Sequence, residues 1–431
     1  MGKNTVFGYR KSLPCAAAVA ASLVVTSCAA ISAPAGGGPG IEFGATAEEY
    51  RDAFDEIEPI HLYAQTPGPQ GSFVSDKMEV YYDAVTEWSG GKVTFEIFYA
   101  NAIAGATEID DALGDGRTDI DGFAPANQPA EYPAVNTLIN ASFLGDMSPL
   151  AGILQSHAWL LESAYATDEV AQEFEDNDMH LLMPSYNGGG MALLCTDEAR
   201  TLDQLRGRQI AAAGRTQGAQ ISGLGAIPVS ASYSELYESL QRGVVDCTAT
   251  SIQNAVLGGY LDITPEVIIE PEAGFALTFG SVALNQNRWE RLPLLVRQLL
   301  FDRLDVFLET NIRTAWEAMV QGVHTIQNAG GTISDFAPDA RDRLRTVNAE
   351  QLETLKNSTA LEDVASSLTQ WSDTADRWSV LVRELGYDES MTYTEFADFY
   401  DDEAVDLGPY VDAVFDEILL AHRPTAPQDD A

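Results

Sequence analysis

Apolar residues recur at helical spacing in some segments of the first part of the chain and alternate as in strands in others. The segment 73–88 has apolar residues at helical spacing, and Gly90-Gly91 ends the predicted helix. A loop rich in Gly and Pro, TPGPQGS, separates this helix from an apolar run that predicts a first strand. The predicted order is a strand at 59–64, the helix at 73–88, a strand at 92–99, a helix at 109–114 and a strand at 118–123. Strands that alternate with helices predict a parallel sheet with crossover helices.

A second series of strands and helices begins near Met191. Its predicted strands are 191–195, 208–213, 227–229 and 244–247, and its predicted helices are 201–206, 217–224 and 233–242. Beyond Pro293 the pattern is helical, with helices expected at 294–328, 341–356 and 361–385. The tail from Pro424 is expected to be loose. An α/β chain of 431 residues is long enough for more than one lobe.

The first residues have the features of an export signal. Lys3, Arg10 and Lys11 precede an uncharged stretch at 13–25, which is too short for a comfortable membrane span. The stretch ends in VTSC, which resembles the lipobox of bacterial lipoproteins and would place a lipid on Cys28. We expect residues 1–27 to be the signal peptide and 28–58 a tether, rich in Gly, Ala and Pro over 30–44. The alternative is an ordinary secretory signal with an accidental cysteine.

Cysteine usage agrees with export. Four cysteines become two once Cys15 leaves with the leader and Cys28 carries lipid. The remaining pair, Cys195 and Cys247, is expected to form a disulfide in an oxidising compartment, with two buried free thiols as the alternative. The histidines are scattered and no cysteine spacing is typical of zinc, so no metal and no cofactor are expected.

The charge balance excludes some partners. The chain has 65 acidic against 24 basic residues, and its negative field repels nucleic acid and anionic lipid. The acidic residues are dispersed along the chain, so we interpret them as a solubility feature that suits a saline habitat.

Three segments resemble the DctP family, the solute-binding proteins of TRAP (tripartite ATP-independent periplasmic) transporters. The segment 91–120 has the family's order of strand, Gly-containing loop and short helix, and 123–144 is similar to the stretch that follows it. The most specific segment is 202–254, which contains LRGRQI, LGAIPV and SELYESLQRGVVD in the family's order and spacing. The resemblance extends over about 59–330.

This resemblance implies a two-lobe periplasmic-binding-protein-like fold, with crossing strands and a long helix joining the lobes. It implies capture of a small organic solute, delivery to membrane permease subunits driven by an ion gradient, and no catalysis. The expected first lobe is 59–186 with 273–315, the second is 187–272 with 316–370, and 371–431 is a C-terminal helical extension. The expected location is extracytoplasmic, with a lipid anchor in the membrane.

The expected ligand-binding residues come from loops at strand ends, where aromatic walls and a few directed hydrogen bonds hold a solute. They are Phe123, Gln128, Tyr132, Tyr186, Asn187, Arg215, Tyr233, Glu235, Ser251, Gln253, Asn254 and Asn285. Gly188-Gly189-Gly190 would let the backbone approach a ligand, although a surface turn explains these glycines equally well. Core packing is the alternative for Phe123, Gln128 and Tyr132, and a helix-terminal role is the alternative for Glu235.

One departure from the family concerns ligand charge. Family members usually have an arginine on the strand after LxG, which grips a substrate carboxylate, and this position is Ala211 here. Arg215 lies four residues further on. We therefore hypothesise that the ligand is either neutral or bound through a different cation.

Two other functions stay open. An exported hydrolase is disfavoured because the sequence has no GxSxG elbow, no HExxH motif and no Cys/His pair at a useful spacing. A sensory solute-binding protein that docks on a receptor kinase would have the same fold, and genes for permease subunits beside this one would argue against it.

Overall fold

The computed structural model describes residues 37–231, 233–387, 391–401 and 404–426. Cys28, the signal peptide and the first part of the expected tether lie outside the described residues. Within those ranges no helix is long and apolar enough to cross a membrane.

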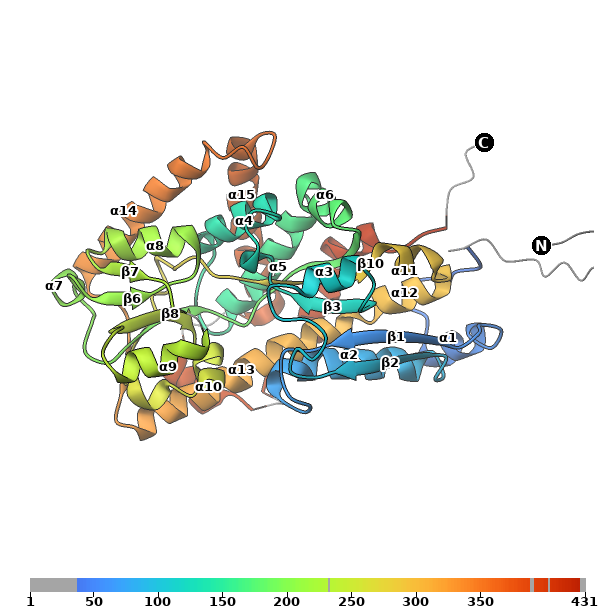
Figure 1. The fold of residues 1–431 in the computed structure, drawn as a ribbon, viewed down its shortest axis with the longest axis horizontal. Helices are drawn as coiled ribbons and strands as arrows, with labels where there is room; N and C mark the ends of the chain where they lie inside the picture. Colours follow the sequence, from blue (N-terminus) through green and yellow to red (C-terminus); the bar gives the residue numbers. More distant parts are fainter. Residues whose placement is uncertain (1–36, 232, 388–390, 402–403, 427–431) are drawn as a thin grey trace, which may run out of the picture. The chain divides into compact units, whose positions relative to one another are not determined.

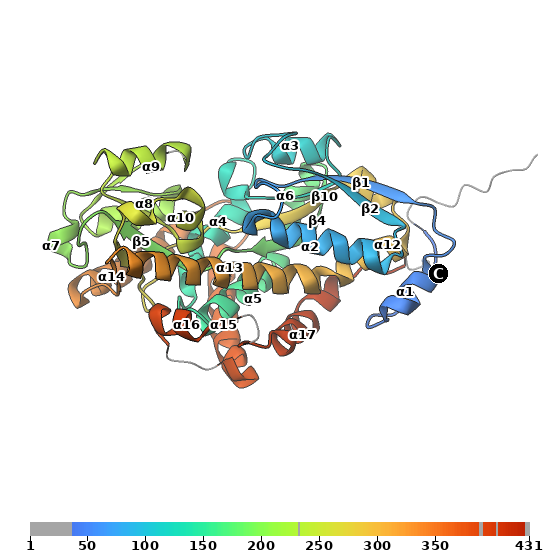
Figure 2. The same cartoon turned by 90° about the horizontal axis from the view of Figure 1, so that it is seen from below.

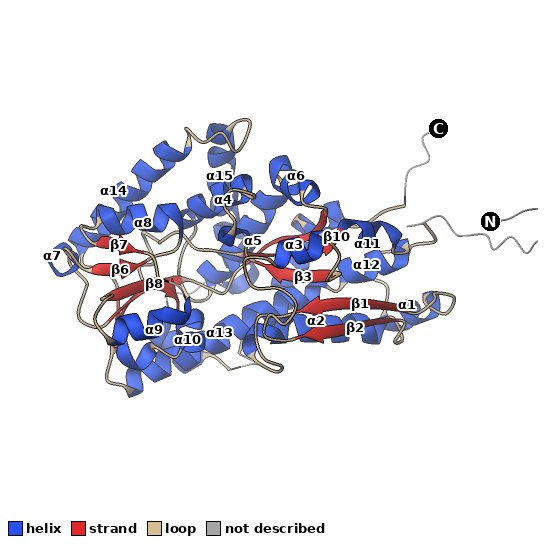
Figure 3. Cartoon of the chain, viewed as in Figure 1, coloured by secondary structure: helices blue, strands red, loops and turns tan. Residues whose placement is uncertain are grey.

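Two mixed β-sheets organise the described chain, and Figure 3 shows their strands as two separate groups. The first sheet has the order β2-β1-β3-β10-β4 and the second has the order β11-β9-β5-β8-β6-β7. The strands of the first sheet are β1 (Ile60–Gln65), β2 (Val93–Phe98), β3 (Ile120–Phe123), β4 (Met179–Tyr186) and β10 (Gly280–Asn285). Those of the second are β5 (Met191–Cys195), β6 (Gln209–Ala211), β7 (Ile227–Val229), β8 (Cys247–Ser251), β9 (Glu266–Ile268) and β11 (Thr332–Ser334).

The predicted parallel pairing is confirmed for the early strands, where β1 pairs in parallel with β2 and β3. Both sheets are nevertheless mixed, because β10 pairs antiparallel with β3 and β4, and β5 pairs antiparallel with β8 and β9. The strand predicted at 244–247 is displaced. It runs from Cys247 to Ser251, whereas Val244 is 56% exposed and precedes it.

The helices flank these sheets, as Figure 1 shows. Those up to the second sheet are α1 (Ala47–Ala53), α2 (Phe73–Trp88), α3 (Ile109–Gly114), α4 (Pro133–Ala141), α5 (Ala151–Tyr165) and α6 (Asp168–Asp176). Those within it are α7 (Leu202–Leu205), α8 (Gly214–Gly223), α9 (Tyr233–Gln241) and α10 (Ile252–Gly258). The remainder are α11 (Gln286–Arg291), α12 (Leu294–Asp302), α13 (Leu304–Asn328), α14 (Pro338–Leu355), α15 (Val364–Val382), α16 (Tyr393–Phe399) and α17 (Gly408–Glu417).

Three connections join the two sheets, so the fold is the expected two-lobe α/β architecture. Residues 187–190, called the lobe link below, run from β4 to β5, and residues 269–279 return from β9 to β10. The third connection is α13, a helix of 25 residues that packs against α2 of the first lobe and α10 of the second. Figure 2 shows this helix running past both lobes. It passes through position 315, where we had placed a division between lobes, and that division stays a proposal.

Part of the expected tether is folded. Thr46 and Glu49 form a capping box at the start of α1, and Tyr50 and Phe54 on that helix are buried. The Ile41 amide also donates to the side chain of Gln298 on α12. These contacts anchor residues 41–54 on the first lobe, because two aromatic rings leave water there.

The C-terminal extension packs on the helices that join the lobes. α15 lies against α5, and α16 lies against α13, where Phe396 and Tyr400 contact the buried ring of Trp316. α15 begins at Val364, so the expected boundary at 371 falls inside this helix.

Candidate functional site

The candidate site lies where the lobe link joins the edges of the two sheets. In the first sheet, the register Gly280↔Tyr186 and Ser281↔Phe123 places the carboxyl ends of β3 and β4 at one edge. In the second, Met191↔Ser251 places the carboxyl end of β8 at the start of β5. Five peptide steps separate Tyr186 from Met191, so these edges are at most about 18 Å apart at the link. Open α/β sheets bind their ligands at such carboxyl ends.

A buried hydrogen-bond cluster fixes the start of the lobe link. Asn311 on α13 donates from Nδ2 to the Asn187 carbonyl at 2.9 Å and to His157 Nε2 at 2.8 Å. His157 Nδ1 lies 2.9 Å from the Ile153 carbonyl, one turn back on α5. Burial lowers the pKa of His157 to about 4, and the charge of Lys77 lowers it further, so the ring is neutral at pH 7. A proton on Nδ1 suits the Ile153 carbonyl and leaves Nε2 to accept from Asn311, whereas the Asn187 carbonyl, 3.0 Å from Nε2, accepts from Asn311.

Sequence reasoning had selected Asn187 but missed His157 and Asn311. Both lie inside helices, where nothing in the local pattern separates them from ordinary core positions. The cluster therefore ties α5, α13 and the link together at one point, and this connection is visible only in the tertiary structure.

Tyr186 ends β4 beside a lysine. Its ring lies over two glycine backbones, because a Cβ atom at Gly122 or Gly280 would come within 2.8 Å of it. The same ring packs edge-on against Phe307 of α13, and Lys77 Nζ lies 4.9 Å from the ring centroid. Burial, and then the nearby Asp121 carboxyl, raise the pKa of Tyr186 above its usual range.

Asp121 is a buried carboxyl on β3. Its Oδ1 accepts the Gln65 amide at 2.5 Å, while Oδ2 has no hydrogen-bond partner among the described residues. Burial raises its pKa to about 8, so the group is protonated at neutral pH.

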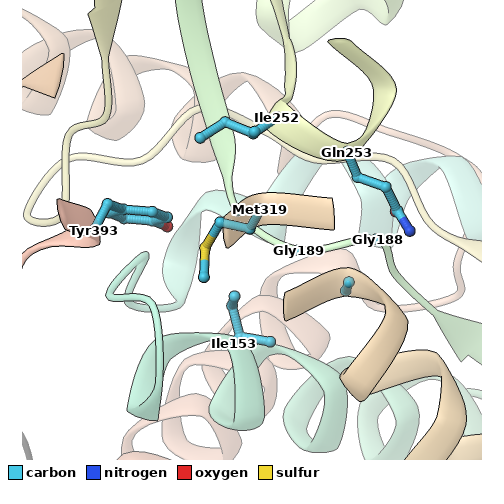
Figure 4. Close-up of a pocket in the computed structure, with 9 residues that line it drawn as sticks. Ile153, Gly188, Gly189, Ile252, Gln253, Met319 and Tyr393 are labelled. Atoms are coloured by element: carbon cyan, nitrogen blue, oxygen red, sulfur yellow. The ribbon is translucent and has the colours of Figure 1, made fainter. Parts of the chain in front are cut away.

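A small pocket with a volume of about 10 Å³ lies against the lobe link (Figure 4). Two glycines of the link admit neighbouring side chains: a Cβ atom at Gly188 would meet Gln253, and one at Gly190 would meet the Tyr393 hydroxyl. That hydroxyl donates to the Met147 carbonyl at 2.6 Å. The wall is formed by Ile153, Gly188, Gly189, Gly190, Ile252, Gln253, Ala315, Met319 and Tyr393. Both lobes, α13 and the C-terminal extension thus meet at this pocket.

Ser251, Gln253 and Asn254 lie together at the end of β8 and the start of α10. Ser251 caps α10 by accepting the Asn254 amide at 3.2 Å, and Asn254 donates from its side chain to Thr250. Gln253 lies on the pocket wall and Asn254 is exposed. These residues share an edge of the second sheet with the lobe link.

Phe123 and Tyr132 lie in the core of the first lobe, where their rings pack on each other and on Phe174. The Tyr132 hydroxyl and Gln128 Nε2 both donate to the buried Asp110 carboxylate, at 3.1 and 2.9 Å. These contacts are structural.

The candidates of the second lobe are dispersed. Arg215 is exposed on the first turn of α8 and Glu235 is exposed on the first turn of α9, which Tyr233 begins. Ala211, at the family's arginine position, is buried at the end of β6.

The expectation for Asn285 is wrong in its position. Asn285 pairs with Met179, at the end of β10 far from Tyr186. Its amide donates to the carbonyls of Leu113 and Gly114, and its oxygen accepts the Arg288 amide at the start of α11. Asn285 is five residue steps along the strand from Gly280, about 17 Å, so it cannot share a small ligand with Tyr186.

The predicted disulfide is confirmed: Cys195 and Cys247 face each other in register on β5 and β8 and are bonded. In the described ranges no group of three His, Cys, Asp or Glu side chains could hold a metal ion.

A family model, "Bacterial extracellular solute-binding protein, family 7" (DctP), matches residues 64–358. Solved structures share the fold. A marine metagenome TRAP solute-binding protein from an unidentified microbe, in complex with co-purified pyroglutamate, is 16% identical with a TM-score of 0.61, covering 74% of this chain and 100% of its own. A TRAP protein from Rhodoferax ferrireducens with benzoate is 20% identical with a TM-score of 0.62, covering 75% and 99%. One from Chromohalobacter salexigens with D-glucuronate is 15% identical with a TM-score of 0.60, covering 73% and 99%.

Proposed function

The chain belongs to family 7 of the bacterial extracellular solute-binding proteins, and we propose that it captures a small organic solute at the lobe link and delivers it to the permease of a TRAP transporter. The observation that carries this proposal is the link itself. It runs through three glycines from the carboxyl end of β4 to the start of β5, which pairs with the carboxyl end of β8, and it lies next to a pocket that both lobes line.

The solute is proposed to be small because the solved relatives of this protein bind small molecules. The solved relatives hold pyroglutamate, benzoate and D-glucuronate, each of which carries one carboxylate. These three compounds, each paired with its uncharged amide, form the test panel. Isothermal titration calorimetry on the purified protein, with mass spectrometry of any co-purified solute, tests the function. Absence of binding by every compound, together with absence of a co-purified solute, would argue against it.

The part that the lobe link plays in solute binding has its own test. Gly189 has a φ of +99° and Gly330, in the turn before β11, has a φ of +75°. An alanine strains either backbone by about 1–2 kcal/mol. Only Gly189→Ala should weaken solute binding, and Gly330→Ala is the matched control. Equal affinities in the two variants would show that the link does not take part.

The lipid anchor is also a proposal, and it rests on the VTSC sequence before Ala29. Detergent phase partitioning of the protein made in its own host, compared with a Cys28→Ala variant, tests it. We expect the wild-type chain in the detergent phase and the variant in the aqueous phase.

A further inference from the structure

Lys77 on α2 is a cation at the edge of the candidate site, and no acidic side chain of the described residues pairs with it. Most arginines of the described chain form ion pairs, as expected where acidic residues outnumber basic ones by 65 to 24. Among the same residues, no carboxylate lies within ion-pair distance of Lys77 Nζ. The side chain is half-buried against the Tyr186 ring, and burial alone lowers the pKa of Lys77 to about 8.

The position of Lys77 follows from the fold. α2 begins at Phe73, eight residues after β1 ends at the same sheet edge as Tyr186. Lys77 is the fifth residue of that helix, about 6 Å along its axis, so its side chain can reach the edge. Its contact with Tyr186 places Nζ at the start of the lobe link.

Two titratable groups beside this cation and the Tyr186 ring do not compensate the charge of Lys77. Burial keeps His157 neutral, because its pKa is lowered to about 4. Burial also keeps Asp121 protonated at neutral pH, because its pKa is raised to about 8. Neither group therefore carries a negative charge that could neutralise Lys77.

A second donor lies on the residue that follows Tyr186. Asn187 is 2% exposed, and its Nδ2 has no hydrogen-bond partner among the described residues. Its two oxygens are occupied, since the carbonyl accepts from Asn311 and Oδ1 accepts the Gly189 amide. A buried amide N–H without an acceptor is costly, and a ligand oxygen would satisfy it.

We propose that the solute is a small carboxylate, and that Lys77 Nζ and Asn187 Nδ2 bind its carboxylate group. The proposal deepens the solute-binding function above and rests on it. In this arrangement Lys77, from the first lobe, takes the place of the family arginine, whose position in the second lobe is Ala211 here. Arg215 is the weaker alternative, because it is exposed on α8.

The test compares each carboxylate of the panel with its uncharged amide, for example benzoate with benzamide. Wild-type protein should bind the carboxylate at least about ten-fold more tightly, and Lys77→Met should reduce this preference to near one. Lys77→Arg should retain most of it. Lys356→Met, which removes an exposed charge from the end of α14, should leave the preference unchanged. Arg215→Ala should also leave it unchanged. Circular dichroism checks that each variant is folded, and we expect Lys77→Met to fold because it removes a half-buried charge.

The outcomes separate this inference from the proposed function. A carboxylate preference that survives in Lys77→Met, or that is lost in Arg215→Ala, overturns the role of Lys77. An uncharged co-purified solute overturns the carboxylate class but leaves solute binding intact. If no solute co-purifies and no compound binds, both proposals fail.

Discussion

Replacing Asp121 with asparagine should remove a loss of stability that the wild-type protein suffers as the pH rises. The carboxyl is 0% exposed, and its pKa rises from 3.8 to about 8 because burial disfavours the charged form. Between these values the unfolded chain has released the proton that the folded protein retains. A rise in pH within this window therefore favours the unfolded chain, and stability is lost.

The size of the effect follows from the shift. Each pKa unit corresponds to about 1.4 kcal/mol, so stability falls by roughly 4 kcal/mol between about pH 5 and pH 8 through this group alone. Asparagine does not titrate, and its amide oxygen can still accept the Gln65 amide. The free energy of unfolding of Asp121→Asn, minus that of wild type, should therefore increase by about 4 kcal/mol over this range.

Urea denaturation followed by tryptophan fluorescence at four pH values measures this difference. Asp115→Asn, at an exposed carboxylate paired with Arg117, is the control for the change in net charge. Only the slope with pH matters, since the constant offset includes the cost of placing an amide at the site. A difference that stays flat from pH 5 to pH 8 would refute the assignment of Asp121 as a protonated carboxyl.

Three further predictions concern stability. Reduction of Cys195–Cys247, which closes a loop of 52 residues, should lower the unfolding free energy by about 4 kcal/mol in urea, and an unchanged midpoint would contradict this. Arg423→Met leaves the buried Asp302 carboxylate unpaired and should cost about 2–4 kcal/mol, with part of the loss recovered when Asp302→Leu is added. His157 has a pKa of about 4 against 6.5 in the unfolded chain, so its protonation removes up to about 3 kcal/mol as pH falls through that window. The variant His157→Gln should lack this part of the acid sensitivity, and an acid midpoint shared with wild type would exclude it.

The local pattern of apolar residues was sufficient to predict those strands and helices that depend only on their own residues. The alternation in 92–99 predicts β2, and the helical spacing in 73–88 predicts α2 with its observed bounds. β10 was not predicted, although it lies inside the first sheet between β3 and β4. Its partners are about 100 residues or more away along the chain, so its place depends on long-range pairing.

The apolar run at 244–247 shows the opposite error. Its residues are typical of a strand, but the pairing of β8 with β5 begins only at Cys247. Val244 is left in solvent, because no neighbouring strand pairs with it. Apolar character alone therefore placed this strand three residues too early.

The candidate site was predicted in part. Tyr186, Asn187 and Gln253 meet at or beside the lobe link, because strand ends and glycines mark that place in the sequence. Asn285 was misplaced, since resemblance to a family position carries no information on which end of a strand faces the ligand. Lys77 was missed, because a lysine on a helix is usually a solvated surface residue.

By itself, the sequence determined the membership in a solute-binding family, the alternation of strands and helices over 59–123 and 191–247, and the cysteine pair. These depend on side-chain period and composition, which are local properties of the chain. The tertiary structure alone decided which charges lose their solvent. The pKa of Lys77 is lowered, Asp121 keeps its proton and His157 stays neutral because segments more than 30 residues apart exclude water around them.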